Sequence, residues 1–218
     1  MEDRISAGLY LEMTKLSPAE YARQRVAEVL ALAEVERASW WQNQRPNRKE
    51  FPRRLPEFTT LGVYEVGQAF KAPEPPSDVT GHHFHHYPRP GQGCLSGKPT
   101  LGLELVLVSP KTPEGAQALR DWADFVHIRQ IAAASVPGFT MITPYENVTG
   151  GEPRFMHFYE MDTEDAEGAF QRMVPETQKR IGNSGKLWDE WFGHEQLVID
   201  YVNTFARVGE AWSRESGR

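Results

Sequence analysis

One pattern of strand and helix segments occurs twice in this chain of 218 residues. Two short strings recur: LYLEM at 9–13 with LGLEL at 101–105, and VYEV at 63–66 with FYEM at 158–161. The copies lie about 92 to 95 residues apart, and at an offset of 95 Leu32 stands opposite His127. We therefore expect one scaffold unit built twice, with a single working pocket in the copy that carries the histidine.

Composition limits the kind of protein and its partners. With 39% hydrophobic and 11% aromatic residues, the chain can bury a core as one large domain or as two of about 100 residues. A net charge of −6 without a long basic run argues against nucleic acid and anionic membrane as partners, and we expect the basic stretch 45–54 to be a solvated loop. The single cysteine, Cys94, and a start without signal-peptide character predict a cytoplasmic location. No transmembrane segment is expected, because the longest low-charge run, 130–145, is too short to span a bilayer.

The second half of the chain reads as a series of strands and helices. Leucines at every second position of 101–108 share one face of a strand. Thr112, Pro113 and Glu114 then favour a helix start. The further elements expected are a helix to about residue 134, strands at 139–148 and 154–161, a helix at 162–181 and a strand at 197–205.

This order predicts an α+β fold of two ferredoxin-like units. The first unit, 1–100, repeats the order less completely, with a strand at 8–15, a helix at 17–37 and strands at 38–44 and 58–66. In place of its second helix, residues 67–100 are rich in proline and glycine. The second unit, 101–218, is complete and has a C-terminal extension. Packed face to face, the two units would close a pseudo-dimeric α+β barrel.

A motif in the second half resembles a known family. The run WADFVHI at 122–128, followed by VPGF at 136–139, is similar to the W-x-x-x-x-H-x-P … P-G-F pattern of the EthD-like branch of the dimeric α/β-barrel superfamily, here in tandem-repeat form. Arg129 departs from the pattern, which often has proline there. The resemblance implies two ferredoxin-like units around a hydrophobic pocket, with His127 near it. Relatives include cofactor-free monooxygenases, lactone isomerases, lyases and haem-handling enzymes, so the resemblance indicates a fold more than a reaction.

His127 is the first candidate for chemistry. An imidazole exchanges protons near neutral pH, and Asp124 at i−3 could orient the ring on one helical face. The alternative is a structural histidine held by a backbone carbonyl, with Asp124 paired to Arg120 instead.

The cluster HHFHHY at 82–87 is the second candidate. On an extended backbone His83 and His85 point the same way, where they could supply a second acid, an oxyanion donor or two ligands of a metal ion. A complete metal site needs three or four ligands, and no acidic or cysteine partner follows at a characteristic spacing. We therefore expect no cofactor, and a metal at His83 and His85 remains an alternative.

The pocket walls are expected to be aromatic. His157 shares a strand face with Phe155 and Tyr159, whereas Glu160 lies on the other face, and the sequence does not tell which face meets the pocket. The expected substrate-binding residues are His157, Tyr145, Trp122 and Phe125.

These features predict a cofactor-independent lyase, isomerase or monooxygenase. His127 would be the base, Asp124 would orient it, and His83 and His85 would assist, on a small hydrophobic phenolic or carbonyl compound. The chain has no glycine-rich nucleotide loop and no serine-hydrolase or zinc-protease motif. The alternatives are a metal-dependent enzyme using 82–86 and a non-catalytic binding or stress protein, as a monomer or homodimer.

Overall fold

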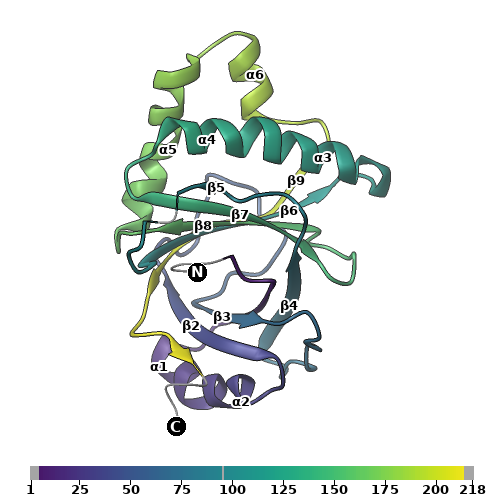
Figure 1. Ribbon diagram of the computed structural model, residues 1–218, viewed down its shortest axis with the longest axis vertical. Helices are drawn as coiled ribbons and strands as arrows, with labels where there is room; N and C mark the ends of the chain where they lie inside the picture. The colour runs from purple at the N-terminus through teal and green to yellow at the C-terminus, as the bar shows by residue number, and fades with distance from the viewer. Residues whose placement is uncertain (1–4, 95, 214–218) are drawn as a thin grey trace.

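A computed structural model describes residues 5–94 and 96–213. Its centre is an antiparallel sheet that closes into a barrel (Figure 1). The barrel strands are β1 (Gly8–Thr14), β2 (Val35–Asn43), β3 (Thr60–Val66), β4 (Val79–His86), β6 (Gly102–Pro110), β7 (Phe139–Asn147), β8 (Phe155–Met161) and β9 (Leu197–Arg207). Their order is β2-β3-β1-β4-β7-β8-β6-β9, and β9 pairs back with β2 to close the ring. The short strands β5 (Gln92–Gly93) and β10 (Trp212–Ser213) add to β7 and β2.

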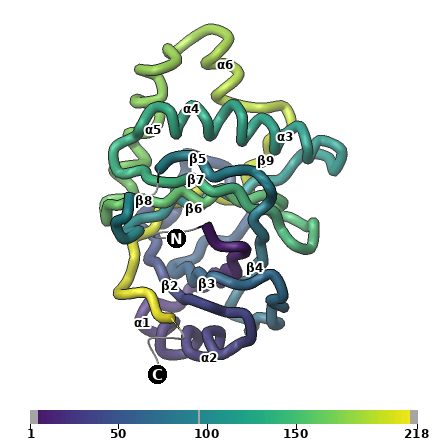
Figure 2. Tube along the Cα trace, in the orientation of Figure 1, coloured from purple at the N-terminus to yellow at the C-terminus, as the bar shows by residue number. Residues whose placement is uncertain are grey.

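Each half of the chain contributes four strands in the ferredoxin-like order. The first half gives β2-β3-β1-β4 and the second gives β7-β8-β6-β9. The predicted α+β fold of two ferredoxin-like units is therefore confirmed. Figure 2 shows that the C-terminal segment, in yellow, returns from the second half to the first, where β10 pairs with β2.

The inside of the barrel is a packed core. Because side chains alternate along a strand, one face of every strand points inward. Leu9 and Leu11 from β1 meet Leu103, Leu105 and Leu107 from β6 there, all 0% exposed. Aromatic side chains complete this core: Trp41, Phe58, Phe84, Tyr145, Phe158, Tyr201 and Phe205.

The helices cover the outer faces at opposite ends of the molecule (Figure 1). The first half has α1 (Pro18–Tyr21), a π-helical turn η1 (Ala22–Val26) and α2 (Ala27–Leu30). The second half has a 3₁₀ turn η2 (Pro113–Gly115), α3 (Ala116–Trp122), a π-helical turn η3 (Ala123–His127), α4 (Ile128–Ala134), α5 (Ala166–Ile181) and α6 (Lys186–Phe192). No helix of the described residues is long and apolar enough to cross a membrane.

Several expected elements differ from those of the structure. The first helix ends at Leu30 rather than 37, because Glu34 takes a left-handed φ of 64° and Val35 begins β2. Within the stretch 67–100, which is rich in proline and glycine, residues 79–86 form β4, the fourth strand of the first half, and the histidine run has the extended backbone considered for it. Residues 186–192, expected to lie in a loop, form α6.

The basic stretch 45–54 is a largely solvated loop, as expected, with Arg48 as its buried exception. It belongs to the connection between β2 and β3, which crosses onto the second half of the molecule. Arg48 is buried there, forms an ion pair with Glu167 and donates a hydrogen bond to Oδ1 of Asn203 at 3.2 Å. The positive charge of Arg48 is therefore paired with a carboxylate of the same chain.

The strand registers correct the alignment of the two copies. Gly8 pairs with Val66 as Gly102 pairs with Met161, so β1 and β6 correspond at an offset of 94 residues (102 − 8). The π-helical turns at 22–26 and 123–127 correspond at 101 (123 − 22), because the loop before the second helix is longer. The counterpart of His127 is therefore Val26 and not Leu32.

The two halves fill the space between sheet and helix differently. In the first half, the Tyr21 hydroxyl lies 2.6 Å from that of Tyr64 and donates to Glu12, which also accepts a hydrogen bond from Arg25. A Cβ on Gly62 would lie 1.9 Å from the Tyr21 hydroxyl, so this space is full. At an offset of 95 (161 − 66), the counterpart of Gly62 in the second half is His157.

A Gly62→Ala substitution tests this packing. The new methyl group would collide with Tyr21, and overpacking of this kind costs about 1–3 kcal/mol of unfolding free energy. We expect a lower urea midpoint for Gly62→Ala and an unchanged one for the control Gly193→Ala, where the Cβ meets nothing within 4 Å and φ is −164°. Equal stability of Gly62→Ala and the parent chain would show that the first half has room at this point.

Candidate active site

A cavity of about 330 Å³ lies between the outer sheet face of the second half and the helices above it. Strands β6, β8 and β9 form its floor, and α3, η3, α5 and α6 form its walls. Its lining is largely apolar: Phe51, Val106, Val108, Trp122, Tyr159, Phe170, Met173, Val174, Trp191, Phe192, Leu197, Ile199 and Val202. The titratable side chains in the lining, besides Tyr159, are Glu50, Glu104, His127 and His157.

The ring of His127 is fixed by α6. Its Nδ1 lies 2.9 Å from the carbonyl oxygen of Trp191, and the indole Nε1 of Trp191 donates to the carbonyl of His127 at 3.2 Å. The imidazole stacks on the indole of Trp191 at 5.4 Å and contacts that of Trp122 at 5.0 Å. A carbonyl only accepts hydrogen bonds, so Nδ1 carries the proton and the lone pair of Nε2 is free for a ligand. Burial lowers the pKa of His127, although the bond to Trp191 opposes this, so the ring is neutral at pH 7.

Asp124 does not orient His127, contrary to expectation. The Tyr87 hydroxyl donates one hydrogen bond shared between the two oxygens of this carboxylate, each at 3.1 Å, and Arg89 donates another at 3.2 Å. The reason is the π-helical turn η3: it takes more residues than an α-helical turn, so residues three apart do not lie above one another. Burial raises the pKa of Asp124 to about 6, while Tyr87 and Arg89 act against the rise.

His157 and Glu104 rise from the floor of the cavity. His157 is 4% exposed and Glu104 is 2% exposed, and His157 Nε2 and Glu104 Oε2 have no hydrogen-bond partner among the described residues. Burial, and then the nearby imidazole of His127, lower the pKa of His157 to about 3. Burial raises the pKa of Glu104 to about 8, and the attraction of Arg48 only partly offsets it. Both side chains are therefore largely uncharged at pH 7 and face the same cavity.

The structure also answers which strand face meets the pocket. His157 and Tyr159 point to the cavity, whereas Glu160 points into the barrel and accepts a hydrogen bond from Thr100 at 2.8 Å. Trp122, one of the expected substrate-binding residues, lies in the cavity wall.

Two expected substrate-binding residues lie elsewhere. Tyr145 belongs to the barrel core, because it pairs with Met156 on the inward face of β7. Phe125 is 56% exposed and lies under the guanidinium of Arg89, since the π-helical turn directs it away from the sheet. Neither residue lines the cavity.

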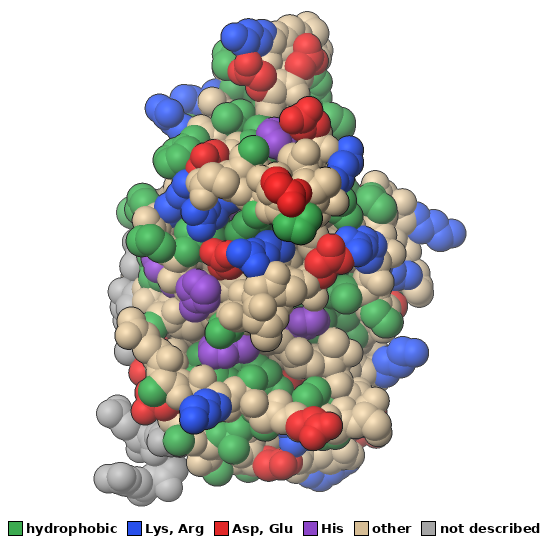
Figure 3. Space-filling model, turned by 90° about the vertical axis from the view of Figure 1, so that its right-hand side faces the viewer, with side chains coloured by type: hydrophobic (Ala, Val, Ile, Leu, Met, Phe, Trp, Pro, Cys, Tyr) green, Lys and Arg blue, Asp and Glu red, His purple; other side chains and the backbone are tan. Residues whose placement is uncertain are grey.

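The histidines of β4 lie in the other half of the molecule. His83 packs edge-on against Phe70 and His85 is exposed, so both are on the outer face of the first half and away from the cavity. Figure 3 views the side on which β4 lies and shows histidine side chains at the surface. Within residues 5–94 and 96–213, no group of three or more His, Cys, Asp or Glu side chains is placed to hold a metal ion.

Sequence reasoning missed Glu104 and Trp191. The signal for Glu104 was present, because it is the one charged residue in a strand of leucine and valine and stands on the face opposite the leucines. Trp191 had no such signal, since only the fold of α6 brings its carbonyl to His127.

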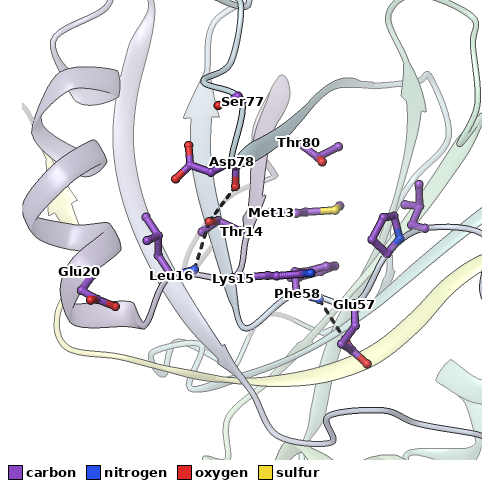
Figure 4. Close-up of a pocket in the computed structure, with 12 residues that line it drawn as sticks. Met13, Thr14, Lys15, Leu16, Glu20, Glu57, Phe58, Ser77, Asp78 and Thr80 are labelled. Atoms are coloured by element: carbon purple, nitrogen blue, oxygen red, sulfur yellow. Dashed lines mark hydrogen bonds between the residues drawn. The ribbon is translucent and has the colours of Figure 1, made fainter.

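A second hollow, of about 490 Å³, opens at the end of the first half (Figure 4). Its charged residues Lys15, Glu20 and Asp78 are exposed. Glu57 is occupied, since it accepts hydrogen bonds from Tyr201 at 2.8 Å and from the backbone of Asn47 at 2.7 Å. This hollow is larger, but it lacks the buried unpartnered groups of the His127 cavity, which is therefore the candidate site.

A Glu104→Gln substitution tests the uncharged state of Glu104. Its folded pKa of about 8 exceeds the ordinary 4.5, so the unfolded chain loses this proton first and stability falls as pH rises from 4.5 to 8. Arg48 and Glu167 are the charged groups that act on it. We expect Glu104→Gln to raise the unfolding free energy by about 3 kcal/mol at pH 7 and by little at pH 4.5, measured by urea denaturation.

The exposed Glu164→Gln variant is the control and should match the parent chain at both pH values. A Glu104→Gln protein that is no more stable at pH 7 than the parent would contradict the buried acid.

Comparisons with solved structures find proteins of the same fold. No protein-family model and no curated protein matches the sequence. An anthrone oxidase-like protein shares 15% identity at a TM-score of 0.56, over 96% of this chain and 95% of that one. A major regulator of staphylococcal pathogenesis shares 7% identity at 0.53, over 93% and 99%. A variant chlorite dismutase from Candidatus Nitrospira defluvii, in complex with cyanide, shares 11% identity at 0.50, over 95% and 93%.

At these identities the likeness concerns the fold alone. The chain thus shares the architecture of two ferredoxin-like units in one barrel.

Proposed function

We propose that this protein is an enzyme that removes a proton from a small, largely apolar compound bound in the second-half cavity, with His127 as the base. The observation that carries the proposal is the bond from Nδ1 of His127 to the carbonyl of Trp191 at 2.9 Å. It fixes the tautomer in which Nε2 is the acceptor, as a general base requires. The lowered pKa keeps that nitrogen unprotonated at neutral pH.

The lining of the cavity supports a class of substrate. Its walls are aliphatic and aromatic, and a volume of about 330 Å³ is near the lower end for small-molecule pockets. A compound of one to three fused rings fits this description. The anthrone oxidase-like neighbour adds a reason to include anthrone among the compounds tested.

The proposed step is proton abstraction from carbon. The C–H bond next to, or conjugated with, a carbonyl or phenol group breaks, and the proton moves to Nε2 of His127. The electron pair of that bond spreads onto the oxygen of the substrate. Lyase, isomerase and cofactor-independent oxygenase reactions can all begin in this way, so the step does not choose among them.

The paired histidines of β4 support a metal-dependent reaction less well. His83 and His85 would supply two ligands, and the described residues place no third ligand beside them. A binding protein without turnover would use the same cavity as the proposed enzyme. The experiment below separates these readings.

A His127→Ala substitution tests the base. Anthrone and related aryl ketones would be incubated anaerobically in deuterated buffer, and exchange of the activated C–H would be followed by NMR above the buffer rate. We expect exchange to fall by about 100-fold or more in His127→Ala, because general-base catalysis contributes factors of this size. Quenching of tryptophan fluorescence by the ketone would show that the cavity still binds it.

The matched control is His83→Ala/His85→Ala, which removes two imidazoles outside the cavity. Its exchange rate should stay within about twofold of the parent rate. Exchange that survives in His127→Ala, or that disappears in the His83/His85 variant, would refute the assignment of the base.

A further inference from the structure

Glu104 lies on β6, the middle one of the three strands that form the cavity floor. On β6 it lies between Tyr159 of β8 and Thr204 of β9, its partners across the two neighbouring strands. His157 stands diagonally from it, two residues along β8, within reach of the same small ligand. Glu104 is 2% exposed, and its Oε2 is buried without a hydrogen-bond partner.

Arg48 is the positive charge that acts on Glu104, but its guanidinium is bound to other residues. Arg48 forms an ion pair with Glu167, donates to Asn203 at 3.2 Å and lies over the ring of Phe170 at 4.5 Å. Glu104 is therefore neither paired nor hydrogen-bonded through Oε2, and a buried carboxylate in this state is costly. The side chain carries its proton, consistent with its raised pKa of about 8. A purely structural glutamate would be expected to have its polar atoms satisfied.

A protonated carboxyl is a hydrogen-bond donor inside an apolar cavity. When a base removes a proton from a carbonyl or phenolic compound, negative charge develops on the ligand oxygen. A preorganised donor at that oxygen stabilises the charge most in a water-poor site. A carboxylic acid kept neutral by apolar surroundings is an established solution to this need.

We infer that Glu104 is a further catalytic residue, donating its proton in a hydrogen bond to the ligand oxygen, and that the cavity consequently selects uncharged ketones and phenols over carboxylates. This rests on the proposed function, in which His127 removes the proton. The selection follows from charge: among the described residues that line the cavity, none is lysine or arginine, and Glu50 adds an acidic group at its edge. A bound carboxylate would have no cation to pair with and would lie against the carboxyl group of Glu104.

The test compares two ligands that share a naphthalene ring and differ in the polar group at position 2. Binding of 2-naphthol and of 2-naphthoate would be measured by quenching of the fluorescence of Trp122 and Trp191, which lie in the cavity wall. The variants are Glu104→Gln, which keeps a donor, and Glu104→Ala, which removes it. The exposed Glu164→Ala variant is the control.

We expect 2-naphthol to bind the parent protein at least about tenfold more tightly than 2-naphthoate does. Its affinity should fall by about tenfold or more in Glu104→Ala and stay within about threefold in Glu104→Gln and in the control. The infrared band of a buried carboxylic acid should be present in the parent, shift when 2-naphthol binds and be missing in both Glu104 variants. A purely structural role would not produce the shift.

Unchanged 2-naphthol affinity in Glu104→Ala, tighter binding of 2-naphthoate, or no binding of 2-naphthol to the parent would overturn the inference. The assignment of His127 as the base can be refuted independently of the inference about Glu104. If 2-naphthol binding depends on Glu104 while His127→Ala keeps full ketone exchange, the donor stands as a ligand contact and the assignment of His127 is lost.

Discussion

Two junctions hold the barrel closed: β4 pairs with β7 through residues 84–86, and β2 pairs with β9 through residues 41–43. Closure turns one face of every strand toward a single interior, which side chains from both halves fill. A ligand site can therefore form on the outer face, under the helices, or at an end of the barrel. The buried groups without a partner then favour the layer between sheet and helices over the hollow at the barrel end.

The two halves use this layer in different ways. In the first half it is filled by hydrogen-bonded tyrosines and by the ion pair of Arg25 with Glu12 at 2.6 Å. In the second half, Glu104 and His157 each leave a buried polar atom without a partner. Unsatisfied buried groups lower stability, so their presence in only one of two similar layers is best explained by a ligand that they contact. On the proposed function, the layer of the first half serves stability and that of the second half holds the site.

Much of the fold and part of the candidate site could be predicted from the sequence. Period-two leucines at 101–107 located β6, and His127, which the motif singled out, lies in the lining of a cavity. The predicted partner Asp124 failed because nothing in the local pattern distinguishes a π-helical turn from an α-helical one. The bond to Trp191 joins residues 64 positions apart, and only tertiary packing creates it. An extended backbone was considered for the histidine run, but its place as the fourth strand of the first half was not assigned, because a strand rich in histidine shows no clear apolar alternation.

The central claim is that His127 presents an unprotonated Nε2 to the cavity. Two-dimensional ¹⁵N NMR of the histidine side chains reports the protonation of each ring nitrogen, and the His127→Ala spectrum assigns the signals. At pH 7 the account predicts a neutral His127 ring with hydrogen on Nδ1 and none on Nε2. An imidazolium ring, or a neutral ring with its hydrogen on Nε2, would contradict it.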